Sequence, residues 1–125
     1  MKKEDVIDAV HSYGLPIALS EFSVTLKDIT GTEDYRLNLQ AQTYRTMMDA
    51  LLESGVCEAV HMRAPCDGAW DLAIPGTTNH DIQNAFDDQV RPKPAYYAVQ
   101  ASLQAAVDRK MTNRRTFPQL AFDRP

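Results

Sequence analysis

The sequence is poor in the residues that build metal centres and disulfide frameworks. Its two cysteines, Cys57 and Cys66, are too few for a disulfide framework or a four-cysteine zinc site. We interpret them as ordinary thiols, although a single bridge between them stays open. The three histidines, His11, His61 and His80, show no metal-ligand spacing, and we interpret them as structural or surface residues. The sequence therefore predicts no metal site.

Long apolar runs and a secretory signal are also missing. No run approaches the ~20 apolar residues of a membrane-spanning helix. The N-terminus begins with two lysines but has no apolar stretch behind them, so it does not read as a signal peptide. The chain as it stands is therefore expected in the cytoplasm, unless its original beginning has been lost.

Length and charge exclude further classes. At 125 residues the chain is one domain, and a complete eight-stranded α/β barrel takes about 250 residues. The net charge of -4 gives no global attraction to nucleic acid or anionic membranes. The charge is uneven, because residues 108–125 carry +3 and the rest of the chain carries -7. We predict one domain over 1–108 and a basic, flexible tail over 109–125.

The apolar spacing predicts an alternation of helices and strands. In order, it predicts helix, strand, helix, strand, a long irregular segment and helix, over residues 3–12, 15–26, 33–54, 56–62, 63–90 and 94–109. Such alternation indicates βαβ units with a parallel sheet. Two parallel strands do not make a viable sheet by themselves, so the pattern indicates part of a larger α/β fold.

The same periodicities predict which side chains face inward. Alternation in the first strand places Glu21 on the same face as Ile17 and Leu19. On the two long helices we expect inward-facing side chains at Leu37, Tyr44, Met47, Met48, Leu51, Leu52, Tyr96, Val99, Leu103 and Val107.

Three blocks of the sequence resemble one protein family, in order and in spacing. The blocks are GLPIALSEFSV at 14–24, QAQTYRTMM at 40–48 and FDDQVRPKPAYYAV at 86–99. They resemble strand seven, the following helix, and the last loop and helix of glycoside hydrolase family 10, the endo-1,4-β-xylanases. The resemblance covers about residues 4–107, the last quarter to third of the family's barrel. It implies an α/β fold, a partial (β/α)8 TIM barrel holding the last two βα units only.

The resemblance also implies functional residues. Glu21 falls on the catalytic nucleophile of the family. Its chemistry fits, because retaining glycosidases attack with a carboxylate about 5–5.5 Å from a second carboxyl group. The resemblance further implies substrate contacts at Arg63, Asp67 and Trp70, a β-1,4-linked polysaccharide such as xylan as ligand, and no cofactor.

The sequence departs from the family pattern at several sites. The family's acid/base belongs to an Asn-Glu pair on strand four, and this chain has neither that pair nor room for strands one to six. Ser23 replaces a usual Asp. Arg63 and Ala64 replace the Trp-Gly of a sugar subsite, while Trp70 stands for a second Trp, one residue early. An Arg can still stack on a sugar, but we interpret the change as relaxed constraint on a site no longer used.

Three functions stay open at this point. The first is a C-terminal fragment of a xylanase-like barrel that is inactive alone. The second is one part of a split enzyme, completed by another chain or by a homo-oligomer through exposed strand edges. The third is a non-catalytic carbohydrate-binding or assembly module that uses Trp70, Tyr96 and Tyr97.

Overall fold

The computed structural model describes residues 1–68 and 82–116, with side chains as far as residue 113. Its elements are, in order, α1 (Lys3–His11), β1 (Ile17–Phe22), α2 (Glu33–Ser54), β2 (Cys57–Met62) and α3 (Pro94–Thr116). The two strands pair in parallel. The predicted alternation and the α/β class are therefore confirmed. No helix among the described residues is long and apolar enough to cross a bilayer.

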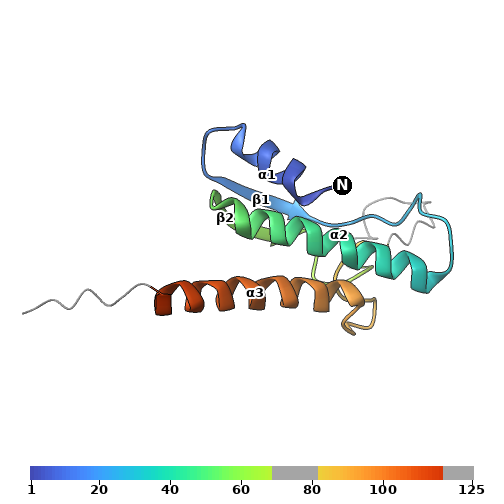
Figure 1. Ribbon diagram of the computed structural model, residues 1–125. Coiled ribbons are helices and arrows are strands. Elements are labelled where there is room, and N and C mark those ends of the chain that lie inside the picture. Colours follow the sequence, from blue (N-terminus) through green and yellow to red (C-terminus); the bar gives the residue numbers. More distant parts are fainter. Residues whose placement is uncertain (69–81, 117–125) are drawn as a thin grey trace, which may run out of the picture.

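The helices form one layer and the two strands lie against it. In Figure 1, α2 runs between α1 and α3, with the sheet behind it. Helix α2 packs against both of the other helices. The face of β1 that points away from α2 leaves Ala18, Ser20 and Glu21 exposed. The unit is thus a two-layer βαβ structure with one open sheet face.

Local signals fix both ends of α2. The Thr32 side chain accepts a hydrogen bond of 3.2 Å from the backbone N–H of Tyr35 and so caps the helix. Glu33 and Asp34 in the first turn favour the positive end of the helix dipole. Gly55 ends the helix with a φ of 72°, a conformation that glycine adopts at little cost. These signals explain why the predicted bounds of 33–54 agree with the structure.

The core centres on Tyr44 of α2. Its ring is fully buried and lies 4.8 Å, between centroids, from the ring of Phe22 on β1. Met48 and Ala95 complete this buried cluster. The predicted inward positions Tyr44, Met48 and Leu51 are confirmed as buried, whereas Leu52 is wrong, because its side chain is 37% exposed.

Two polar side chains of α2 reach past the strand ends. The Tyr44 hydroxyl donates a hydrogen bond of 2.8 Å to the carbonyl of Gln83. The Gln40 side-chain amide donates to the carbonyls of Val24 and Ile82, at 2.8 and 2.6 Å. Helix α2 therefore holds together the segment that leaves β1 and the segment that leads toward α3.

The last helix differs from its prediction in length. It continues to Thr116 instead of ending near 109, so it runs through residues 109–116 of the predicted tail. Residues 117–125 lie outside the described residues.

The inward face of α3 agrees with its prediction in part. Val99 is half-buried and packs against the core around Tyr44, as predicted. The expected inward positions Leu103 and Val107 are wrong, because these side chains are 47% and 54% exposed. The fully covered positions are instead Ala95 and Ser102.

The variant Tyr44→Phe tests the buried phenol. It keeps the ring but removes the donor to the Gln83 carbonyl, so we expect the free energy of unfolding to fall by about 1–3 kcal/mol at neutral pH. Urea titration measures this loss. The control is Tyr35→Phe, at a side chain that is 57% exposed, where an equal loss would contradict the assignment.

The comparison of wild type with Tyr44→Phe also predicts how folding stability depends on alkaline pH. Burial raises the pKa of Tyr44 to about 12. Above about pH 10 the unfolded chain releases this proton while the folded chain keeps it, so folding stability falls as pH rises from about 10 to 12. Wild type should therefore lose stability relative to Tyr44→Phe over this range. A difference between the two that does not change with pH would be incompatible with a buried phenol.

Candidate active site

A bulge in β1 decides where Glu21 points. The paired residues Leu19–Val60 and Phe22–Met62 enclose two residues on β1, Ser20 and Glu21, but only His61 on β2. Two residues opposite one form a β-bulge, which breaks strict alternation along a strand.

Because of the bulge, Glu21 lies on the opposite face of β1 from the one predicted. Ile17 and Leu19 are half-buried, whereas Glu21 is exposed. Phe22, the next residue, packs on Tyr44 toward α2, so Glu21 points to the opposite, open face of the sheet. The expectation that Glu21 shares a face with Ile17 and Leu19 is therefore wrong, because it assumed an unbroken strand.

The exposed polar residues gather at the C-terminal ends of the two strands. Glu21 is the penultimate residue of β1, and Arg63 directly follows β2. The backbone N–H of Arg63 donates to the carbonyl of Phe22 at 3.1 Å, which continues the strand pairing past β2. Glu21, His61 and Arg63 are all exposed. This end of parallel barrel strands is where barrel enzymes carry their catalytic groups.

Asp67 does not share that exposure. It is 5% exposed, and its Oδ2 lies 2.8 Å from the ammonium of Lys93, which is 6% exposed. Its Oδ1 accepts a hydrogen bond of 2.8 Å from the backbone N–H of Asn84. The Lys93 ammonium also donates to the carbonyls of Ile82 and Asn84. Both oxygens of the predicted substrate contact are thus already used within the chain, where they tie the segment after β2 to the start of α3.

The other residues singled out in the sequence lie in different environments. Trp70 lies outside the described residues. Tyr96 packs between other rings, with centroids 5.0 Å from Phe86 and 5.2 Å from Tyr97. Tyr97 is 55% exposed. Ser23, at the position where the family has Asp, donates to the side-chain oxygen of Gln83 at 3.1 Å.

The cysteines are both free thiols, which excludes the bridge that the sequence left open. Among the described residues, no group of three or more His, Cys, Asp or Glu side chains is arranged to hold a metal ion.

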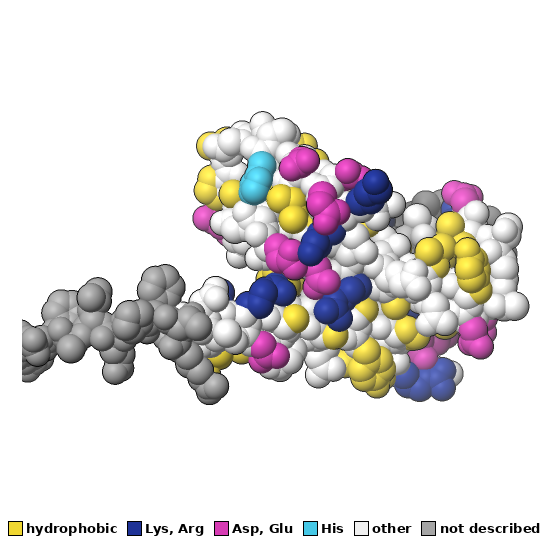
Figure 2. All heavy atoms as spheres, viewed as in Figure 1, with side chains coloured by type: hydrophobic (Ala, Val, Ile, Leu, Met, Phe, Trp, Pro, Cys, Tyr) yellow, Lys and Arg dark blue, Asp and Glu magenta, His cyan; other side chains and the backbone are white. Residues whose placement is uncertain are grey.

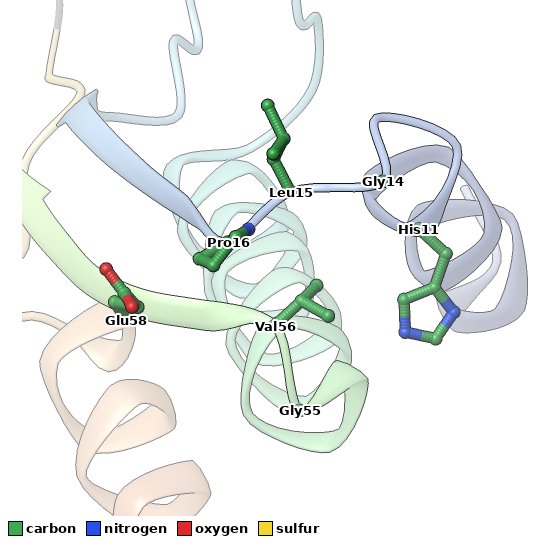
Figure 3. Close-up of a pocket in the computed structure, with 7 residues that line it drawn as sticks. All are labelled: His11, Gly14, Leu15, Pro16, Gly55, Val56 and Glu58. Carbon is green, nitrogen blue, oxygen red and sulfur yellow. The ribbon is translucent and has the colours of Figure 1, made fainter.

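A pocket of about 300 Å³ lies at the other end of the strands (Figure 3). Pro16 and Val56, which precede the two strands, line it together with His11. The ring of His11 is hydrogen-bonded to the carbonyl of Ser54 at 2.8 Å, which joins α1 to the end of α2. This end of barrel strands serves stability. The pocket is therefore separate from the Glu21 end.

Two residues of this region have partners that the sequence does not reveal. His61 is exposed, in agreement with its interpretation as a structural or surface residue, and it lies opposite the bulge that holds Glu21. Only the register between the strands reveals this, so no sequence signal was present. Lys93 lies inside the Pro-Lys-Pro of the third block, and a lysine between two prolines was a usable signal for a fixed position.

Comparison with known proteins decides the family. The model of glycosyl hydrolase family 10 matches residues 2–102, most of the chain. The chain belongs to glycosyl hydrolase family 10. No curated protein matches it significantly.

Solved structures agree with this family assignment. Xylanase 10B from Thermotoga maritima is 24% identical, with a TM-score of 0.72, over 87% of this chain and 34% of that one. Xylanase 10B from Thermotoga petrophila, solved with xylobiose, is 27% identical, with a TM-score of 0.66, over 81% and 30%. The family 10 chain described here thus has the fold of a TIM-barrel segment and spans about a third of these relatives.

The buried Asp67–Lys93 pair generates a stability prediction. Lys93→Met leaves the Asp67 carboxylate buried without its counter-charge, so we expect unfolding free energy to fall by about 3–5 kcal/mol. The matched control is Arg91→Met, which breaks the Arg91–Asp87 pair, where the Arg91 side chain is 67% exposed. That variant should cost far less, because a solvent-exposed ion pair contributes little to stability. Urea denaturation measures both, and equal losses would contradict a structural role for the buried pair.

Proposed function

We propose that this chain is the C-terminal part of a retaining endo-1,4-β-xylanase barrel, that Glu21 is the nucleophile of that barrel, and that the chain is inactive alone. The observation that carries the proposal is the position of Glu21, exposed at the C-terminal end of a parallel strand in a family 10 chain. A solved relative holds xylobiose, which supports a β-1,4-linked xylan as the ligand class.

The chemistry of retention needs more than this carboxylate. The nucleophile attacks the anomeric carbon while a second carboxyl, about 5–5.5 Å away, protonates the departing oxygen. Among the described residues, the bulge places Glu21 next to Ser20 on β1 and opposite His61 on β2. Neither of these side chains carries a carboxyl group. Loss of general acid catalysis costs roughly 10²–10⁴-fold in rate. Within residues 1–68 and 82–116, the exposed face around Glu21 also offers no enclosing walls to hold a sugar ring in line for attack.

The other predicted contacts take different roles in this proposal. Arg63 is an exposed donor near the Glu21 strand end and would hydrogen-bond sugar hydroxyl groups. Asp67 would act indirectly, by fixing the segment that follows Arg63 through its bonds to Lys93 and Asn84. Trp70 is proposed as the stacking residue of a sugar subsite.

Hydrolysis of xylan by the purified chain tests the proposal. We expect no release of reducing sugar above the level given by Glu21→Gln, because the acid/base partner and the cleft walls are missing from these residues. The comparison with Glu21→Gln separates turnover by this site from a contaminating enzyme. Clear turnover that Glu21→Gln abolishes would refute the proposed inactivity.

A complementing chain is the second candidate, and the sheet favours it. Within the described residues each strand pairs with only one neighbour, so β1 and β2 each keep one free edge. Free edges recruit further strands. Co-expression with the first two-thirds of the Thermotoga maritima xylanase should then yield a complex with xylanase activity that Glu21→Gln removes. A stable complex without activity, or no complex, would reject this candidate.

A further inference from the structure

Gln83 is held beside the end of β1 by three hydrogen bonds. Its carbonyl accepts from the Tyr44 hydroxyl at 2.8 Å and from the backbone N–H of Val24 at 3.1 Å. Its side-chain oxygen accepts from the Ser23 hydroxyl, also at 3.1 Å. The residue is half-buried. Both its backbone and its side chain are therefore held in place by the chain itself, as a preorganised binding group requires.

Ser23 brings the Gln83 side chain to the face that carries Glu21. Phe22 is buried and Val24 packs against the same core, so Ser23, which lies between them, points to the opposite face. Glu21 is exposed on that open face as well. Successive residues of an extended chain are about 3.3 Å apart, which puts Ser23 about 6–7 Å beyond Glu21. The Gln83 amide therefore lies on the open face, just past the end of β1.

Within the described part of the chain, the Gln83 amide leaves both of its N–H donors unused. Its oxygen is bonded to Ser23, and no described acceptor is bonded to its NH2 group. The Arg63 guanidinium is likewise without a hydrogen-bond or ion-pair partner in residues 1–68 and 82–116. Arg63 lies between the inward-facing Met62 and Ala64, so it also points to the open face. Past the end of each strand, one described side chain thus keeps donors available.

Donors on the helical face are used differently. Figure 2 shows charged side chains of both signs gathered between α1 and α3. There Glu53 accepts from Lys3 at 2.7 Å and lies 3.6 Å from Arg109. Arg45 pairs with Asp49 at 2.8 Å. These donors are satisfied within the chain, whereas the donors beside the candidate nucleophile are available to a ligand.

We infer that the Gln83 side-chain amide is a substrate-binding group, which donates to a hydroxyl oxygen of the sugar that Glu21 faces, and that Ser23 is its positioning residue. The inference rests on the proposed function and adds to it a contact outside the three family blocks. The NH2 group and the guanidinium offer donors only, so they require a ligand rich in acceptor oxygens. Every ring of a β-1,4-linked polysaccharide carries such oxygens as hydroxyl groups.

Nuclear magnetic resonance on the purified chain tests the inference. Titration with xylotriose should shift the two side-chain N–H signals of Gln83 together with the backbone N–H signals of Glu21 and Arg63, with one dissociation constant. Gln83→Leu removes the amide but keeps the hydrogen-bonded backbone carbonyl, and it should weaken binding about two- to tenfold, the range for one neutral hydrogen bond. The matched control is Gln100→Leu, the same change at an exposed residue of α3, which should leave the affinity unchanged.

Variants of Ser23 test its positioning role. Ser23→Ala frees the Gln83 amide and should weaken binding in the same range, whereas Ser23→Thr keeps the hydroxyl and should bind as wild type does. The wild-type shifts remain decisive if a variant fails to fold.

The outcomes separate this inference from the proposed function. Shifts at Glu21 and Arg63 without a shift of the Gln83 side chain, or equal affinities of Gln83→Leu and Gln100→Leu, would overturn the inference and leave the proposed function standing. No shift at this strand end with millimolar xylotriose would overturn the inference and would also count against xylan as the ligand.

Discussion

The fold depends on hydrogen bonds from α2 to the segment that follows β1 and to the segment that leads toward α3. Tyr44 and Gln40 are buried, and their polar groups bind backbone carbonyls at 24, 82 and 83, far from α2 in the sequence. A buried carbonyl without a donor is costly, so these bonds select one path for both segments. The aromatic contact of Tyr44 with Phe22 anchors the end of β1 to the same helix.

That anchor determines where the candidate nucleophile lies. With Phe22 held against Tyr44, the bulge turns Glu21 to the open face, beside His61 across the strand pair. The buried Asp67–Lys93 pair has a similar positioning role after β2, because it fixes the segment that follows Arg63. Buried polar contacts therefore position the strand end that carries the candidate nucleophile, while Glu21 itself lies exposed on the open face of the sheet.

Much of the fold could be predicted from local signals. The bounds of α2 follow from a polar start, a regular apolar spacing and a glycine end, all of which act within a few residues. The three family blocks identified the fold, because motif spacing reflects the order of barrel elements.

The misses share a physical cause. The bulge at Glu21 is a property of the pairing between β1 and β2, and neither strand encodes it alone. Likewise, α3 buries the small side chains of Ala95 and Ser102 completely while Leu103 and Val107 stay half exposed, which periodicity by itself does not reveal. The resemblance implies a sugar contact at Asp67, but it does not reveal the buried ion pair with Lys93, which is 26 residues away in the sequence.

The central claim is that this chain alone builds the strand end that presents Glu21. Amide hydrogen exchange on the purified chain tests it most directly. The backbone N–H groups of Arg63 and Val24 donate to the carbonyls of Phe22 and Gln83, and these bonds hold the backbone that directly follows Glu21. The account predicts that these two amides exchange far more slowly than those of an unfolded peptide. Exchange at the unfolded rate, while the amides of α2 stay protected, would contradict it.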